Sequence, residues 1–339
     1  MTANLDSHRS IWWAVLVLAV LVLLPIGRSS ELPLACLALA GLVLLAQRRI
    51  DLREPATHLV LALFACYWLP ALLSGLSAVE PEKSASTIAS TLRFLPFGLF
   101  VVWALRDAAR WTTLTVAIGV VVALWLVDAY VQMATGYSLG GVAEAERLSG
   151  IFGAGNLKFG PVLATLSPFV LLGARACWGR RGLALAFVLL AAPILLAGSR
   201  AAWLSYALVS VLVAWHETRN VRWFAAVLVA LAIAFATLAT LALHDSTRFD
   251  ARIDRSLLAL HGTEHAVDEA SAGRLSIWRT ALAMSAAHPL TGVGVRGFRY
   301  AYPHYATPGD RFVDTTSDTG ASHAHQIVLE VLSETGAIG

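Results

Sequence analysis

The sequence predicts an all-α protein that crosses a membrane many times and carries one large polar loop. Of its 339 residues, 58% are hydrophobic and only 14% are charged, whereas soluble globular chains are about half apolar and about a quarter charged. The apolar residues also form blocks of roughly spanning length instead of alternating as in a soluble core. A polar stretch at 244–325 separates the last complete block from an apolar run that begins near Ile327.

Nine apolar blocks are expected to form helices. They lie at roughly 11–27, 32–47, 57–78, 85–105, 112–133, 159–174, 183–198, 201–215 and 223–243. Several are shorter than the ~20 residues that cross a bilayer comfortably. The first block lacks a cleavage motif after it and is expected to be retained. With the run at Ile327, the sequence predicts about nine to ten membrane helices, and further C-terminal spans are expected beyond Gly339.

The blocks divide the chain into five parts. These are an N-terminal bundle of about five spans at 1–133, a loop at 134–158, further spans at 159–243, the large loop at 244–325 and the start of another helix at 326–339. In the large loop, Leu275, Trp278 and Leu282 recur at helical spacing before Pro289, and 251–260 has the pattern of a short amphipathic helix. The large loop is therefore expected to be helical.

Positive charges predict the orientation, because short cytoplasmic loops carry an excess of Lys and Arg. With a cytoplasmic N-terminus, the inside positions hold eleven basic residues: Arg9, Arg48, Arg49, Arg53, Arg106, Arg110, Arg175, Arg180, Arg181, Arg219 and Arg222. The short outside loops hold only Arg28, Lys83, Arg147, Lys158 and Arg200. Both 134–158 and 244–325 are then outside the cytoplasm. The net charge of +3 gives no reason to expect nucleic-acid binding.

The few basic residues expected outside suit an anionic ligand. Arg147 and Lys158 bracket the glycine-rich segment RLSGIFGAGNLK, Arg200 lies in AGSRAAW, and Arg274 and Arg279 lie in the large loop. Guanidinium groups bind phosphate oxygens through charge-assisted hydrogen bonds, and exposed glycine amides add donors, so a diphosphate is the natural ligand. Alternatively, these arginines reach lipid headgroups or pair with nearby acids. Those acids are Glu144, Glu146 and Asp268.

Seven of the ten histidines fall in the large outer segment: His244, His261, His265, His288, His304, His323 and His325. His325 lies where SHAHQ meets the next apolar run, at the expected membrane boundary. A neutral imidazole there is suited to accept a proton from a sugar hydroxyl. The alternative interpretation is an interfacial polar residue that caps a helix.

A metal site is not expected. His261 and His265 have the i, i+4 spacing of a helix, with Glu264 and Asp268 nearby, and His323 and His325 would point the same way on an extended segment. However, the chain has neither an HExxH motif nor paired cysteines, and glycine follows His261 directly.

Asp128 and Arg93 are the main ionisable residues inside the expected spans. Charges within a membrane are costly and usually face a cavity or each other. A proton-coupled pathway and a pair that holds helices together both fit them. A multi-span transporter therefore stays open as an alternative from a different functional class.

Four segments together resemble the O-antigen ligase and polymerase superfamily of membrane glycosyltransferases, and most of all the O-antigen ligases. They are RLSGIFGAGNLKFGPVL, AGSRAAW, GRLSIWRTALAMSAAHPLTGVGVRGF and SHAHQIVLEVLSETGAIG. They occur in the family's order, from about Arg147 to Gly339, and each alone is loose. Gln326 stands where the family usually has Asn, which keeps the amide.

The resemblance implies roles for individual residues. His325 would be the general base that deprotonates the acceptor hydroxyl. The donor diphosphate would be bound by Arg147, Arg200, Arg274, Lys158 and Asn156. Supporting roles would fall to His323, Gln326, Trp278 and Arg279. Neither a metal nor another cofactor is implied, because fixed cations stabilise the leaving diphosphate.

The resemblance also implies a function. The expected protein is an O-antigen ligase of the bacterial inner membrane, with its active site facing the periplasm and its N-terminus in the cytoplasm. It would transfer O-antigen polysaccharide, with inversion, from undecaprenyl diphosphate to a sugar hydroxyl of lipid A–core oligosaccharide. An O-antigen polymerase and a protein O-oligosaccharyltransferase are alternatives within the superfamily. The expected partners are this donor, this acceptor and membrane lipids.

Overall fold

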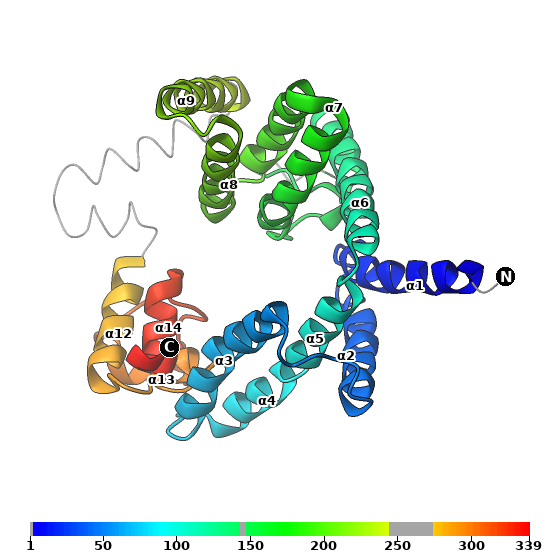
Figure 1. Cartoon of the computed structure of the whole chain (residues 1–339). Coiled ribbons are helices and arrows are strands. Elements are labelled where there is room, and N and C mark those ends of the chain that lie inside the picture. The colour runs from blue at the N-terminus through cyan, green and yellow to red at the C-terminus, as the bar shows by residue number, and fades with distance from the viewer. Residues whose placement is uncertain (1–2, 143–146, 244–273) are drawn as a thin grey trace. The chain divides into compact units, whose positions relative to one another are not determined.

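The computed structural model describes residues 3–142, 147–243 and 274–339 of the chain and is mostly helical (Figure 1). The helices are α1 (Ala3–Val22), α2 (Glu31–Ala46), α3 (Pro55–Gly75), α4 (Pro81–Thr91), α5 (Phe94–Ala104), α6 (Ala108–Thr135), α7 (Phe159–Leu196), α8 (Arg200–Thr218), α9 (Val221–Leu243), α12 (Arg274–Ala287), α13 (Phe298–Tyr305) and α14 (Ile327–Thr335). Short 3-10 turns, η1 and η3, cover Gly150–Phe152 and Gly336–Ile338. Strands β1 (Tyr137–Ser138) and β2 (Gly141–Val142) form a small antiparallel hairpin. The expected all-α class is confirmed.

Four helical stretches of the described chain are long and apolar enough to cross a membrane. They are Pro55–Gly75, Pro81–Ala104, Ala108–Thr135 and Phe159–Leu196. Shorter apolar stretches occupy Trp13–Val22, Glu31–Ala46 and Val221–Ala230. The larger number of nine to ten spans stays a prediction. α14 has nine residues and is followed directly by η3, so the span expected from 326 onward also stays a prediction.

α7 is a helical hairpin, although its helical assignment is continuous. A straight helix of its 38 residues would be about 57 Å long. Instead its two ends meet, because a Cβ placed on Gly160 would lie 2.8 Å from the Cβ of Ala197. The reversal occurs at Gly179, whose φ of 65° and ψ of −155° are not helical. The two halves correspond to the blocks at 159–174 and 183–198.

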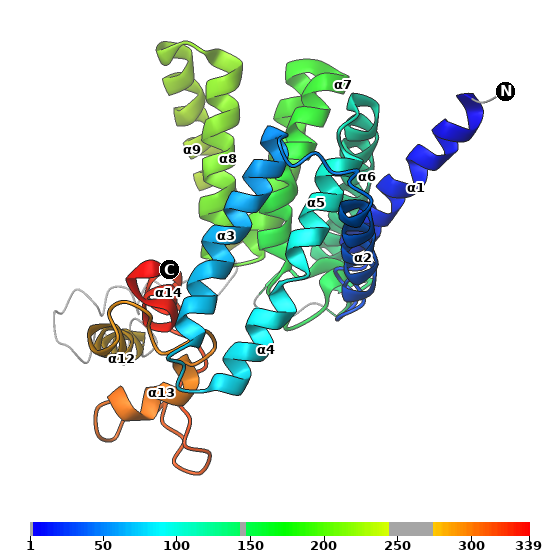
Figure 2. The same cartoon turned by 60° about the horizontal axis from the view of Figure 1, so that its bottom comes forward.

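The chain forms two compact units. The first contains residues 1–37 and 103–246, and the second contains 38–102 and 247–339, within the described ranges. The first therefore holds α1, α6, the β-hairpin and α7–α9. In it α7 packs between α6 and α8, and α9 packs on α8 (Figures 1 and 2). The second holds α3, α4, most of α5 and α12–α14.

The first unit keeps its polar backbone groups satisfied around two helical prolines. Proline lacks an N–H and so frees the carbonyl four residues earlier, which is costly without water. The Ser167 hydroxyl donates to the Ala164 oxygen at 2.7 Å, the carbonyl that Pro168 frees. The Tyr130 hydroxyl of α6 donates to the Leu189 oxygen at 3.1 Å, the carbonyl that Pro193 frees. These contacts let α7 keep both prolines.

The second unit has its own apolar core beneath α12, α13 and α14. Ile277 and Met284 of α12 pack with Phe298 and Tyr302 of α13. Here too a helical proline is compensated. Pro303 frees the Arg299 carbonyl, which accepts from the Gly320 N–H at 2.9 Å. α12 confirms the helix expected after Gly273, whereas the helix expected at 251–260 lies outside the described residues.

Candidate functional site

Two buried polar side chains of α6 fix the segment that carries Arg147. The Gln132 Oε1 accepts from the Gly150 N–H at 2.7 Å and from the Ser149 N–H at 3.2 Å. The Asp128 Oδ1 accepts from the Leu139 N–H at 2.7 Å. Both side chains are almost completely buried. A hydrogen bond formed away from water holds its partners firmly, so the turns at 139 and 149–150 are fixed to the helix.

The Arg147 side chain lies over the turn between α7 and α8. The Leu148 N–H donates to the Leu196 oxygen at 3.0 Å, which joins the two segments. A Cβ added to Gly198 would lie 3.3 Å from the Arg147 Cγ, so a larger residue would crowd the arginine. The segment that begins the first motif therefore packs against the second motif, AGSRAAW.

Arg200 is the first residue of α8 and is exposed. The Ser199 hydroxyl caps this helix by accepting from the Ala202 N–H at 3.4 Å. The Trp203 indole N–H donates to the carbonyls of Ile194 and Leu195 at 3.1 and 3.2 Å. Both contacts hold the turn, so the positive end of the α8 dipole and the Arg200 guanidinium lie together.

Arg147 and Asn156 line one small cavity of about 10 Å³, together with Phe159, Gly160 and Ala197. That volume holds about one water molecule. The Asn156 Oδ1 accepts from the Lys158 N–H at 3.1 Å, which forms the turn into α7.

The structure thus brings four of the predicted diphosphate-binding residues to one end of the first unit: Arg147, Asn156, Lys158 and Arg200. Within the described part of the chain, the cations among them form no ion pair. Glu144 and Glu146, the predicted alternative partners of Arg147, lie outside the described residues.

His325 belongs to the second unit, on a turn fixed from α12. The Trp278 indole N–H donates to the carbonyl of Ala324 at 3.1 Å, and Ala324 is completely buried. His325 has a φ of 54°, in the left-handed region that costs a non-glycine residue about 1 kcal/mol or more. The hydrogen bond to Ala324 therefore helps to keep His325 in a left-handed backbone conformation, which an unconstrained segment would not favour.

The residues around His325 are ordered by α14. The Gln326 side chain caps α14 by accepting from the Leu329 N–H. The His323 Nδ1 lies 3.1 Å from the Glu330 Oε1, and the two histidine rings are 6.4 Å apart in an edge-to-face arrangement. A cap and a carboxylate one helical turn apart therefore orient the SHAHQ segment.

The surroundings keep the His325 imidazole neutral. The partial loss of hydration lowers the pKa of His325 below its ordinary value of 6.5, and the positive charge of Arg274 lowers it further. His323 acts in the same direction, while Glu330 opposes it. Near neutral pH His325 is therefore unprotonated, as a general base must be.

Gly292 of PLTGVG and Gly336, the residue that follows α14, bring these two segments into close contact. A Cβ on Gly336 would lie 2.2 Å from the Leu290 oxygen, and a Cβ on Gly292 would lie 2.4 Å from the Glu334 carbonyl carbon. The Glu334 carboxylate accepts from the Phe298 N–H at 3.4 Å. The third and fourth motifs are thus parts of one packed body.

Sequence reasoning missed the supporting roles of Gln132, Glu330 and Glu334. Glu334 occupies the acidic position of the fourth motif, so its place in the pattern was a signal. Asp128 was interpreted as a partner of Arg93 or a proton-pathway residue. Its described hydrogen bond is instead to the Leu139 N–H. Arg93 belongs to the other unit, and both interpretations stay predictions.

The remaining predicted residues have individual positions. Arg274 begins α12 and is half-buried, whereas Arg279 is exposed on the same helix. His261, Glu264, His265 and Asp268 lie outside the described residues. Among the residues that are described, no three His, Cys, Asp or Glu side chains gather as metal ligands do.

These features define a helical membrane protein with ordered polar clusters at the ends of its helices. Residues 185–339 match the family described as O-antigen ligase. The match supports membership of the chain in the O-antigen ligase and polymerase superfamily, as the four motifs predicted. It includes three of those motifs, and RLSGIFGAGNLK precedes it. No curated protein and no solved structure matches the chain.

Proposed function

We propose that the chain is an O-antigen ligase, a membrane glycosyltransferase that uses a polyprenyl-diphosphate-linked glycan. The single observation that carries the proposal is His325, a neutral histidine on an anchored turn with the charge of Arg274 acting on it.

The proposed reaction is a direct displacement. The His325 imidazole takes the proton of an acceptor hydroxyl, and the resulting oxygen attacks the anomeric carbon as the bond from that carbon to the diphosphate oxygen breaks. The diphosphate leaves with the electron pair, and attack from the opposite face inverts the anomeric centre. Arg274 stabilises the leaving group's charge, and the resemblance of the motifs assigns binding of the donor diphosphate to Arg147 and Arg200 as well.

The proposed donor is O-antigen on undecaprenyl diphosphate, and the proposed acceptor is lipid A–core oligosaccharide. Such a lipid donor is already activated, so the reaction needs no nucleotide and no metal. These substrates support a location in the bacterial inner membrane with the site on the periplasmic side, and the distribution of arginines supports an N-terminus in the cytoplasm.

An O-antigen polymerase is the second candidate, because it shares the donor chemistry and therefore the same residues. Its acceptor is another lipid-linked repeat. A protein O-oligosaccharyltransferase is a third candidate for the same reason. A transporter would leave the ordered arginine and histidine motifs without a role.

The test is transfer in vitro with purified protein in detergent, excess chelator, the lipid-linked donor and the lipid A–core acceptor. We expect chelator-resistant product that is lost in His325→Ala and in Arg200→Ala. His304→Ala is the matched control, because His304 is an exposed histidine of α13 outside the motif. Growth of glycan on the lipid carrier, with none on core, would identify a polymerase. Full activity of His325→Ala would remove the proposed base.

A further inference from the structure

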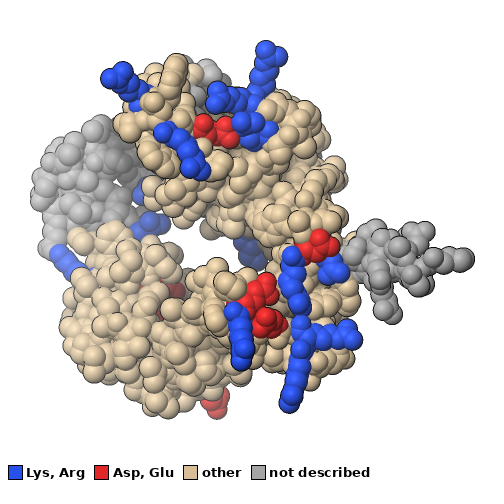
Figure 3. Space-filling view, viewed as in Figure 1, with Lys and Arg blue, Asp and Glu red and all other residues tan. Residues whose placement is uncertain are grey.

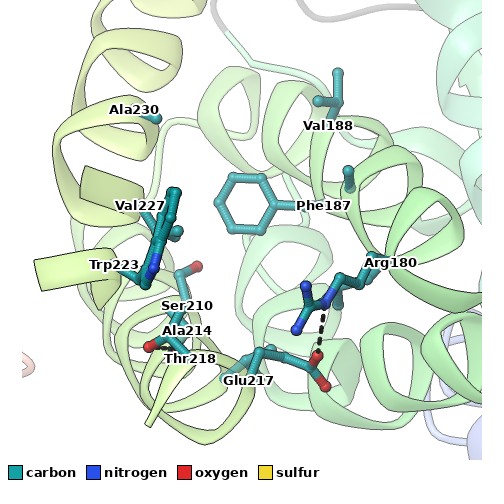
Figure 4. A pocket seen from close by; sticks show the side chains of 13 residues that line it. Arg180, Phe187, Val188, Ser210, Ala214, Glu217, Thr218, Trp223, Val227 and Ala230 are labelled. Carbon is teal, nitrogen blue, oxygen red and sulfur yellow. Dashed lines mark hydrogen bonds and ion pairs between the residues drawn. The ribbon is translucent and has the colours of Figure 1, made fainter. Parts of the chain in front are cut away.

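The second half of α7 encloses an apolar groove with α8 and α9. The groove has a volume of about 630 Å³, within the range of ligand-binding pockets. Its walls include Leu183 and Phe187 of α7, Val213 of α8 and Val227 of α9. Figure 4 shows Phe187 and Trp223 entering the space from different helices. Neither proposed substrate group, the diphosphate or the sugar, suits so apolar a lining.

The groove is open to the surface of these helices. Ala184, Val188 and Trp223 line it and are also exposed. Water cannot satisfy its own hydrogen bonds in so apolar a space, and an empty groove forfeits dispersion contacts. A hydrocarbon chain restores those contacts, and lipid acyl chains are the medium that surrounds a protein in a bilayer.

One end of the groove is strongly cationic. The Glu217 carboxylate lies 2.8 Å from the Arg175 Nε and 3.9 Å from the Arg180 Nε (Figure 4). The Arg180 side chain is 80% exposed, so its remaining donors are available. Arg181, Arg219 and Arg222 are exposed at neighbouring positions of the chain, on the turns that adjoin this ion pair. In Figure 3 basic side chains gather round an acidic patch at this end of the first unit.

We propose that this groove binds an anionic phospholipid, with one acyl chain among the apolar walls and the headgroup phosphate on Arg180. Guanidinium groups bind phosphate oxygens in bidentate fashion, and basic pockets between membrane helices bind acidic headgroups. A second copy of the chain is a poorer occupant. A two-fold interface would bring two such arginine clusters together, with like charges desolvated.

This lipid is distinct from the proposed glycan donor. The hairpin of α7 turns at Gly179 beside the arginine cluster, whereas Arg147 and Arg200 lie at its other end, where residues 160 and 197 meet. The groove and the predicted diphosphate residues are therefore at opposite ends of the first unit. The inference does not rest on the proposed function, since a polymerase or a transporter of this structure would have the same groove.

The experiment uses the protein in nanodiscs of phosphatidylcholine with a small fraction of photoactivatable phosphatidylglycerol or photoactivatable phosphatidylcholine, followed by peptide mapping. We expect the phosphatidylglycerol probe to label α7 and α9 groove peptides more strongly than the phosphatidylcholine probe. Arg180→Gln and Arg181→Gln should each reduce that labelling about fivefold, since each basic residue contributes about 1 kcal/mol to binding of acidic lipid. Arg53→Gln, an exposed arginine outside the groove, should leave it unchanged.

A second pair of variants tests the acyl chain. Ala184→Trp fills the groove and should abolish labelling, whereas Leu185→Trp, at an exposed neighbour that does not line the groove, should not. Equal labelling by both probes, or labelling unaffected by both arginine changes, would overturn the proposal. So would displacement of phosphatidylglycerol by undecaprenyl diphosphate at lower concentration, which would make the groove a donor site. A loss of dimers in Ala184→Trp would make it a protein interface.

Discussion

At the scale of single residues, the chemistry of His325 depends on its neighbours more than on the imidazole itself. An anchored turn fixes the backbone beside His325, and partial loss of hydration lowers the pKa of its imidazole. Two charges of opposite sign also act on the ring, one from Arg274 and one from Glu330. Because these charges shift the pKa of His325 in opposite directions, they give two predictions of opposite sign. Each prediction distinguishes a His325 that acts as the general base from a His325 that has only a structural role.

The first concerns Arg274. A general base works only when unprotonated, so activity should fall on the acid side of the pH profile with a midpoint below 6.5. Arg274→Gln removes a charge that disfavours the imidazolium, so the pKa of His325 and this midpoint should rise. The rate should also fall. We would measure kcat/KM against pH, with Arg311→Gln, at an exposed arginine of the same unit outside the four motifs, as the control. An unmoved acid limb in Arg274→Gln would contradict the role of His325.

The second concerns Glu330. Its charge raises the pKa of His325, and its Oε1 lies 3.1 Å from the His323 Nδ1. Glu330→Gln keeps an oxygen that can accept from His323 but loses the charge. The acid limb should therefore move to lower pH, with little change in rate at neutral pH. The same kinetic profile measures it, and Glu330→Ala, which also removes the hydrogen bond, should lower the rate. A shift to higher pH in Glu330→Gln would reject this arrangement.

At the scale of elements, long-range hydrogen bonds from α6 hold the loop that bears Arg147. Gln132→Ala leaves the buried N–H groups of Ser149 and Gly150 without their acceptor, which should cost about 2 kcal/mol. Thermal unfolding in detergent would show the loss. Donor KM should rise as well, because Arg147 is no longer fixed. Met133→Ala, at an exposed neighbour on the same helix, should change neither. A stable Gln132→Ala protein with an unchanged KM would show that the loop is held otherwise.

The sequence was most informative about helices and least about the contacts between them. Hydropathy located α3, α6 and both halves of α7 within a few residues, because a membrane leaves the backbone few alternatives to helix. The hydrogen bond from Leu139 to Asp128 joins residues 11 apart, and that from Phe298 to Glu334 joins residues 36 apart. No local pattern specifies such partners. For the same reason, the interpretation of Asp128 started from the free-energy cost of a charge inside a membrane. It did not foresee the hydrogen bond that Asp128 accepts from the Leu139 N–H.

At the scale of the whole molecule, the distribution of arginines predicts which surfaces face the cytoplasm. Cys177 lies beside the arginine cluster of the α7 hairpin, and Thr315 lies in the predicted outer segment; both are exposed. In intact cells whose outer membrane has been made permeable, a membrane-impermeant thiol reagent should label Thr315→Cys but not Cys177. The other two cysteines would first be replaced by serine. Labelling of Cys177 alone would reverse the predicted orientation.

The acceptor is also a property of the whole molecule, because ligase and polymerase share the donor residues. Cells that lack a ligase should accumulate long polymer on undecaprenyl diphosphate and carry bare lipid A–core. Cells that lack a polymerase should instead attach single repeats to the core. We expect the first pattern, and we expect His325→Ala to reproduce it while the protein remains in the membrane at its normal level. Separation of the lipopolysaccharide by size and analysis of the lipid-linked glycan would distinguish the two. Single repeats on the core, in cells with either the deletion or His325→Ala, would contradict the ligase. His325 would then be the general base of chain growth, and the acceptor would be another lipid-linked repeat.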